Sequence, residues 1–250
     1  MISERLPSDW YDLQNQVARI LGECGMNVEV EKSISLARGA AEIDVFASES
    51  HQGRTNTIFC ECKHWKSSVP QSVIHSFRSV VADGGANVGY IIASSTFQSG
   101  ARSAADLTNI RLLTWHEFQA EFESSWIEHH LRPHLTERLD EFMTLLEPLE
   151  PRPFRDLSHS DQRAFIALRD EYAPLGILAM QFTTYVALLG GAVPKLPLRD
   201  RLPEGPLPAI LTPDLLDATG YREFFDVLVS LCDPAEEQLQ AVLRRAPRVR

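Results

Sequence analysis

The sequence contains few cysteines, no long hydrophobic run and no excess of positive charge. Four cysteines in 250 residues are too few for a disulfide scaffold, and Cys60 and Cys62 do not form a CxxC motif. This cysteine content indicates a reducing setting. The N-terminus lacks the basic and apolar stretches of a secretory signal. We therefore expect a cytoplasmic protein.

The apolar run Leu175 to Leu189 is interrupted by Gln181, Thr183 and Thr184. A helix that spans a membrane needs about 20 apolar residues, so this fifteen-residue run is better explained as a buried helix. No membrane association is expected. The apolar and charged fractions, 44% and 23%, are those of an ordinary globular protein.

The net charge of −10 argues against a protein that coats nucleic acid through bulk positive charge. Residues 1–134 carry eleven Lys and Arg against sixteen Asp and Glu, so the N-terminal half is acidic as well. DNA binding would therefore require a local basic patch and the help of a metal ion.

A short stretch, residues 58–63, carries an acid and an ammonium group two positions apart within apolar and cysteine residues. Strand alternation places Phe59, Glu61 and Lys63 on one face. An acid and an ammonium group side by side within such a strand point to a function. A plainer alternative is that Glu61 and Lys63 form a surface ion pair, which would contribute little.

The preceding stretch, residues 41–47, also alternates, with Asp44 on the face of Phe46 and Ile43 on the opposite face. If the two stretches pair as a hairpin centred between residues 52 and 53, Asp44 lies opposite Glu61. Carboxylates about 5 Å apart repel each other unless a cation lies between them or one is protonated. A divalent metal ion held by Asp44 and Glu61, with Lys63 beside it, resolves this conflict.

This arrangement suits phosphodiester hydrolysis. Mg²⁺ is bound through one or two carboxylates and accepts phosphate oxygens, and it lowers the pKa of an attacking water. An adjacent lysine can orient that water or stabilise the transition state. The sequence therefore predicts Asp44, Glu61 and Lys63 as catalytic residues with Mg²⁺ as cofactor, for which Mn²⁺ would substitute.

Asp44, followed seventeen residues later by Glu61-Cys62-Lys63, resembles the D…ExK core of the PD-(D/E)xK nucleases. Residues 10–118 are similar to the Mrr-type restriction endonuclease branch of that superfamily. The similar segments are residues 13–25, 39–47, 60–65, 69–82 and 85–105.

This resemblance implies a metal-dependent DNA endonuclease with a restriction or phage-defence role. It adds the backbone carbonyl of Cys62 as a metal ligand. Because cutting both strands usually needs two active sites, it also implies a homodimer.

Many relatives carry Glu in the first helix at the position that matches Gln14. Its absence puts a second metal ion or a water-positioning contact in doubt, but leaves the first metal site unaffected. Further residues are candidates for lining the site or contacting DNA, Lys66 through phosphate and Trp65 through stacking, although a solvated strand end is the plainer interpretation. The full set is Gln14, Glu42, Trp65, Lys66 and Gln71.

The predicted fold class is α/β: a restriction-endonuclease-like mixed sheet flanked by helices, followed by a mostly helical C-terminal region. Residues 1–8 are expected to form a loose arm. Ser8-Asp9 is expected to cap a helix over residues 10–23, and Pro133 to kink a long helix that begins near residue 116. The other predicted elements are strands at 26–34, 41–47, 58–63, 88–94 and 110–114 and helices starting near 70 and 99.

We predict a nuclease domain at 1–147 and a helical domain at 148–250, which lacks a recognised catalytic constellation and suits partner binding, dimerisation or substrate sensing. Ser158, Thr212-Pro213 and Asp233-Pro234 are predicted helix starts. His129, His130 and His134 suggest zinc, but no Cys or acid completes a known ligand spacing.

An alternative function is a catalytically inactive nuclease fold that binds nucleic acid or protein. Gln14 and the acidic charge favour this alternative, whereas the intact set of Asp44, Glu61 and Lys63 favours the enzyme.

Overall fold

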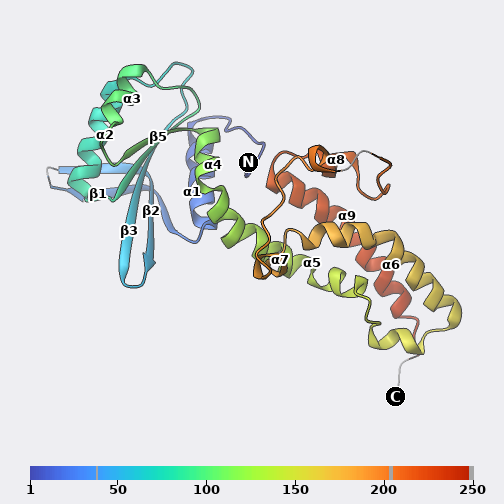
Figure 1. Ribbon diagram of the computed structural model, residues 1–250. Coiled ribbons are helices and arrows are strands. Elements are labelled where there is room, and N and C mark those ends of the chain that lie inside the picture. Colours follow the sequence, from blue (N-terminus) through green and yellow to red (C-terminus); the bar gives the residue numbers. More distant parts are fainter. Residues whose placement is uncertain (38, 203–204, 248–250) are drawn as a thin grey trace. The chain divides into compact units, whose positions relative to one another are not determined.

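The computed structural model describes residues 1–37, 39–202 and 205–247. It separates into two compact units (Figure 1). Arg5–His129 form the first, here called the sheet unit. Met1–Glu4 and the chain from His130 onward form the second, the helical unit.

The described residues of the sheet unit form one mixed sheet in the order β1-β2-β3-β4-β5. The first three strands are antiparallel neighbours, and β3, β4 and β5 run parallel to one another. This confirms the predicted fold class. The strands are β1 Asn27–Leu36, β2 Gly39–His51, β3 Arg54–Lys63, β4 Val88–Ala93 and β5 Ile110–Thr114.

Helices cover both faces of this sheet (Figure 1). α1 and α4 contact each other on one face, and α2 and α3 contact each other on the other. The predicted Asp9 cap is confirmed, because its side chain accepts from the amide of Asp12. The helices are α1 Trp10–Glu23, α2 Gln71–Gly84, α3 Ser99–Ala105 and α4 Trp115–Trp126.

The hairpin of β2 and β3 turns where the sequence analysis places it. Gln52 and Gly53 are both left-handed, with φ of 49° and 78°, as a tight two-residue hairpin turn requires. The strand pairs run from His51 and Arg54 to Val45 and Cys60, which confirms the predicted register. This register brings the acidic residues of the two strands to the same end of the hairpin.

The long helical segment after β5 is interrupted by one π-helical turn, Ile127–Leu131 (η1). Pro133 lies directly beyond this turn, in the first turn of α5 (Arg132–Leu146). Proline has no backbone N–H and crowds the preceding turn, which accounts for the irregularity that was predicted there. By its contacts α5 groups with α6 and α9. The division into separate domains at residue 147 stays a prediction.

The helical unit is built on α5, α6 and α9, which pack against one another. Within the described ranges, no helix is both long and apolar enough to cross a membrane. Its remaining elements are η2 Arg152–Asp156, α6 His159–Met180, α7 Thr184–Leu188, η3 Arg199–Arg201, α8 Pro213–Asp217 and α9 Tyr221–Leu243.

Two helix predictions for this unit are wrong. The apolar run that was expected to form one buried helix breaks after Met180, where the Thr183 hydroxyl bonds the Met180 carbonyl, and Leu188 is 83% exposed. Asp233-Pro234 lies inside α9 instead of starting a helix, because the buried stripe of α9 continues through it. Asp233 instead forms an ion pair with Arg138. The predicted starts at Ser158 and at Thr212-Pro213 are confirmed.

The N-terminal arm is tied down, contrary to the expectation of a loose segment. Ile2 is fully buried, and the carbonyl of Met1 accepts from the amide of Tyr221. The Glu4 carboxylate accepts from the amides of Thr219 and Gly220 at the start of α9. The helix N-terminus favours such a negative group, which explains why the arm docks there.

Candidate active site

Asp44 lies on β2 where the pairing to both neighbouring strands is interrupted. On one side the pairing with β1 skips Glu31, whose φ of 53° is left-handed and rare for this residue type. On the other side the regular pairing with β3 ends at Val45 and Cys60. Side-chain alternation is also interrupted. Ile43 packs with Phe46 and Phe59 in the apolar cluster beneath α2, so the prediction that it lies on the face opposite Phe46 is wrong.

The Asp44 carboxylate is mostly buried and close to a second acid. Its Oδ2 accepts from the amide of Cys62 at 2.7 Å. Burial and, to a smaller extent, the nearby charge of Glu61 raise its pKa from 3.8 to about 6, against the opposing effects of the Cys62 amide and Lys63. This site therefore resists a bare negative charge and favours a proton or a cation.

Glu61 and Lys63 follow one another on the same face at the end of β3. The Lys63 ammonium donates to Glu61 Oε1 at 2.5 Å, and the two side chains are 18% and 25% exposed. A cation–π contact places the same ammonium 5.6 Å from the ring centroid of Trp65. The ammonium is thus held next to the acid pair by contacts from two sides.

Cys62, between these residues, contributes its backbone. Its amide donates to Asp44, and its carbonyl accepts from the Trp10 indole at 3.1 Å. Its thiol is buried, and burial raises the thiol pKa well above 9. The side chain is thus kept protonated, so the carbonyl oxygen is the group of this residue that can serve a hard cation.

Gln14 reaches the same place from α1. It is fully buried, and its Nε2 donates to the backbone carbonyl of Asp44 at 3.0 Å. Its Oε1 is buried and has no hydrogen-bond partner among the described residues. An unsatisfied buried carbonyl oxygen costs free energy, so a cation or a water molecule beside it would be stabilising.

With this geometry in place, the comparisons with known proteins become informative. Residues 6–121 match the model of the Mrr catalytic family, which is described as a restriction endonuclease. The match covers a little under half of the chain, and this segment is similar to that family. The match includes every site residue named above and ends within α4.

Solved structures resemble the chain more distantly. A crystal structure of a protein of unknown function, AF1548, is 19% identical with a TM-score of 0.39, over 52% of this chain and 77% of that one. The MspJI restriction endonuclease in complex with a 27-mer oligonucleotide is 13% identical with a TM-score of 0.33. That alignment covers 49% of this chain and only 28% of MspJI. No curated protein matches the chain.

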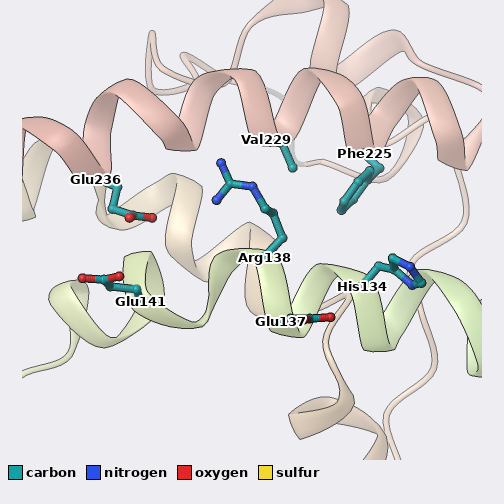
Figure 2. A pocket seen from close by; sticks show the side chains of 7 residues that line it. All are labelled: His134, Glu137, Arg138, Glu141, Phe225, Val229 and Glu236. Carbon is teal, nitrogen blue, oxygen red and sulfur yellow. The ribbon is translucent and has the colours of Figure 1, made fainter.

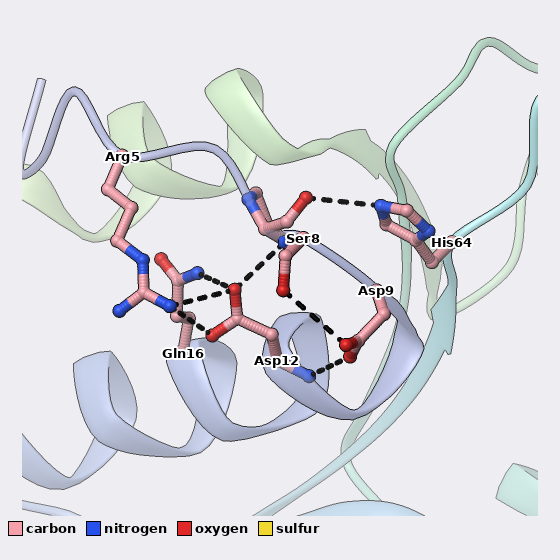
Figure 3. Close-up of polar contacts among 7 residues, drawn as sticks. Arg5, Ser8, Asp9, Asp12, Gln16 and His64 are labelled. Atoms are coloured by element: carbon pink, nitrogen blue, oxygen red, sulfur yellow. Dashed lines mark hydrogen bonds and ion pairs between the residues drawn. The ribbon is translucent and has the colours of Figure 1, made fainter.

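A polar network docks the start of α1 of the Mrr-type domain beside β3 (Figure 3). His64, directly after β3, contacts the carbonyl of Pro7 at 3.1 Å through Nε2. Asp12 accepts from the guanidinium of Arg5 at 2.9 Å and from the amide of Ser8 at 2.9 Å. Burial opposes these contacts, but together they hold the pKa of Asp12 below 3.8. The network fixes the first turn of α1 next to the acid pair.

A small cleft of about 200 Å³ opens on the α2 side of the Mrr-type domain. Glu61, Lys63 and Trp65 line it together with Glu42 and Ile43, opposite one face of α2. Trp65 is 39% exposed. Four of the predicted site or DNA-contact residues thus line one cleft, and their roles stay predictions.

Lys66 and Gln71 do not line this cleft. Lys66 is exposed beyond the end of β3. Gln71 is the first residue of α2, and its side chain lies against Gly100 of α3. The two are so close that a Cβ atom at Gly100 would be 2.7 Å from Gln71 Oε1. Their DNA contacts stay predictions.

The donor set of the Mrr-type domain fits a hard divalent cation. It consists of two carboxylates, from Asp44 and Glu61, the carbonyl of Cys62 and the unsatisfied Oε1 of Gln14. Mg²⁺ needs no more than one or two carboxylates because it retains several waters. The described ranges hold no group of three His, Cys, Asp or Glu side chains suited to a metal ion. His129, His130 and His134 therefore form no such group.

A larger groove of about 530 Å³ lies in the helical unit (Figure 2). Figure 2 shows Glu141 and Glu236 facing each other from α5 and α9, with Arg138 between the two helices. Phe225 and Val229 add apolar surface. These acids already have local partners, since Gln240 Nε2 donates to both Glu141 and Glu236.

Sequence reasoning did not identify the role of Trp10. It is the first residue of the predicted helix, it is 40% exposed, and its indole donates to the carbonyl of Cys62. His64 and Pro7 were likewise not paired. No local signal marks either contact, because residues about fifty positions apart meet only when α1 docks beside β3.

Proposed function

We propose that this protein is a divalent-metal-dependent DNA endonuclease with Asp44, Glu61 and Lys63 as its catalytic residues and Mg²⁺ as its metal ion. One observation carries the proposal: a buried carboxylate with a raised pKa lies beside a second acid whose neighbour is an ammonium group. The match of residues 6–121 to a restriction endonuclease family supports this activity and DNA as the substrate.

In this proposal Asp44 and Glu61 hold the cation through their carboxylates, with the Cys62 carbonyl as a further ligand. A bound divalent cation lowers the pKa of a water and stabilises charge on the phosphate. Asp44 is suited to this task because burial and Glu61 already disfavour its uncompensated charge.

Lys63 would act on the substrate. Lys63 lines the cleft, and its ammonium lies 2.5 Å from Glu61 Oε1. There it would orient the attacking water and stabilise the negative charge that develops on phosphorus-bound oxygens as the P–O bond breaks. Trp65 and Lys66, directly after β3, would contact the sugar-phosphate chain or a base.

Cleavage of supercoiled plasmid DNA tests this proposal. The wild-type protein is expected to nick or linearise the plasmid in Mg²⁺ and in Mn²⁺. Lys63→Ala is expected to lose activity by about 100-fold or more. Lys32→Ala is a matched control, because that lysine is also ion-paired on the same sheet, to Glu29, but lies outside the site.

Equal cutting by wild type and Lys63→Ala would overturn the assignment of the site. Absence of cutting by wild type, with both metals and on several DNA substrates, would favour the second candidate below. Both variants are to be compared with wild type by circular dichroism, so that a folding defect is not mistaken for a catalytic one.

A nuclease fold that only binds nucleic acid or protein is the second candidate. Gln14 favours it, since its amide donates to the Asp44 backbone where many relatives carry an acid. Calorimetry separates the candidates, because the enzyme must take up Mg²⁺ or Mn²⁺ and a binding module need not. DNA binding without metal uptake would support the module.

Further parts of the proposal concern the setting of the protein. We propose a restriction or phage-defence role and a homodimer, because double-strand cutting usually needs two active sites. A mass equal to one 28.1 kDa chain by light scattering, with and without DNA, would contradict the dimer. The helical unit is proposed to bind a protein partner, and the four buried free thiols suit the cytoplasm.

A further inference from the structure

Trp10 is the first residue of α1, and its side chain reaches the end of β3. It is 40% exposed, yet its indole Nε1 donates to the carbonyl of Cys62 at 3.1 Å. The indole also lies close enough to the Asp44 carboxylate to lower its pKa, which favours the negative form. One N–H group thus faces two oxygens that come from neighbouring strands.

These two oxygens are also proposed ligands of the divalent cation. The third, a carboxylate oxygen of Glu61, accepts from the ammonium of Lys63 at 2.5 Å. Each of these three ligands therefore already faces a hydrogen-bond donor of the protein, whereas Gln14 Oε1 has none among the described residues. A proton of the indole and a cation compete for the same lone pairs, because both bind along them.

The position of the Trp10 ring is set by contacts that hold the first turn of α1. The network of Figure 3 docks the first turn of α1 through His64 and Pro7 and through Arg5 and Asp12. The ring is nevertheless only partly covered, so its side chain can rotate away without disturbing the buried stripe of the helix. By contrast Gln14, one turn later, is fully buried and has no such freedom.

We propose that Trp10 gates the metal site: its indole N–H holds the Cys62 carbonyl beside the Asp44 carboxylate in the metal-free protein, and a divalent cation displaces it. The inference rests on the proposed metal site and concerns how that site is loaded. Trp10 is thus a positioning residue that preserves the spacing of the ligands and limits metal affinity.

Calorimetric titration with Mn²⁺ tests the competition directly. Trp10→Phe keeps an aromatic ring and removes the N–H, so the variant is expected to bind Mn²⁺ about fivefold more tightly than wild type. Tyr11→Phe, an exposed neighbour on the same helix, is the matched control and is expected to bind like wild type. Unchanged or weaker binding by Trp10→Phe would overturn the gate.

Fluorescence provides a second measurement that does not require Trp10 to be replaced. In a Trp65→Phe background, the remaining tryptophans other than Trp10 are Trp115 and Trp126, which are 3% and 1% exposed. Addition of Mg²⁺ is expected to shift the emission to longer wavelength and to increase acrylamide quenching as the Trp10 ring enters solvent. Asp44→Asn in the same background is expected to abolish this response.

The two proposals fail in different ways. If neither wild type nor Trp10→Phe takes up Mg²⁺ or Mn²⁺, the metal site and the gate are both wrong. If both proteins bind the metal with equal affinity and Trp10 emission does not change, the gate alone is wrong and the nuclease proposal stands.

Discussion

The acids at the cleft of the sheet unit and those in the groove of the helical unit differ in their hydrogen-bond partners and in the charges that surround them. The groove is larger, about 530 Å³ against about 200 Å³, and Gln240 donates to two of its acids, Glu141 and Glu236. Burial and Glu141 raise the pKa of Glu236 there as well. Beside Glu61, which lines the cleft, burial and the charge of Glu61 together raise the pKa of Asp44 from 3.8 to about 6. The size of a cavity is therefore a poorer guide to chemistry here than the convergence of poorly compensated oxygens.

The backbone explains this difference. On a regular strand or helix, polar side chains recur at fixed intervals on one face. The acids of α5 and α9 lie on regular helices of this kind. Asp44 lies where the pairing of β2 is interrupted on both sides, opposite the left-handed Glu31. An interrupted strand turns a carboxylate toward backbone groups that a regular sheet would keep paired, which is how polar atoms converge there.

The largest expected effect is on plasmid cleavage, when one acid is replaced in each of the two cavities. Glu61→Gln is expected to reduce plasmid cleavage by about 100-fold or more, because it removes a charge on which the proposed cation depends. Glu141→Gln, the matched change in the groove, is expected to change the rate by less than about twofold. A similar loss in both variants, measured under identical metal conditions, would remove the functional distinction between the cavities.

The next largest effect concerns the core of the helical unit. Leu228 is fully buried on α9, so Leu228→Ala is expected to lower the free energy of unfolding by about 3 kcal/mol. Leu188→Ala, at an 83% exposed position of α7, is expected to change it by less than about 0.5 kcal/mol. Urea denaturation followed by circular dichroism measures both values. Equal effects would contradict the packing described for α5, α6 and α9.

A third effect concerns how much the buried charge of Asp44 lowers the free energy of unfolding, and it depends on pH. Asp44 has a raised pKa in the folded protein, about 6 against 3.8, so the folded state holds its proton more tightly. Its contribution to stability is thus favourable below pH 4 and is lost as the pH rises toward 6. Asp44→Asn is therefore expected to stabilise the protein by about 2 kcal/mol at pH 8.

Urea denaturation of wild type and Asp44→Asn at pH 5 and at pH 8, in EDTA, checks this prediction. The gain from the substitution should be smaller at pH 5. A variant that is less stable than wild type at pH 8 would show that the hydrogen bond from Cys62 outweighs the burial of the charge.

The smallest effect tests whether the surface pair of the helical unit is only structural. Arg138 and Asp233 are ion-paired, but their side chains are 44% and 46% exposed. A double-mutant cycle of Arg138→Ala and Asp233→Asn is expected to give a coupling below about 1 kcal/mol. A larger coupling would show that this ion pair contributes more to stability than an ordinary exposed pair does.

Much of the sheet unit is predictable from local pattern. The Asp9 cap and the apolar spacing define α1, and left-handed turn residues at 52 and 53 fix the register of the hairpin. The same register places Asp44 and Glu61 at one end of the hairpin. The helical unit was less predictable, because prolines are weak boundaries when an apolar stripe continues through them, as at Pro234 in α9.

By itself, therefore, the sequence determined the order of the elements, the hairpin register and the acid pair with its lysine. These depend on contacts near in sequence, whose periodicity is visible in the residues. Only the tertiary structure decided that Ile43 leaves its expected face, that Gln14 bonds the Asp44 backbone and that the Trp10 indole reaches the Cys62 carbonyl. Such contacts depend on how α1 docks beside the sheet, and the energy of docking is summed over many distant residues.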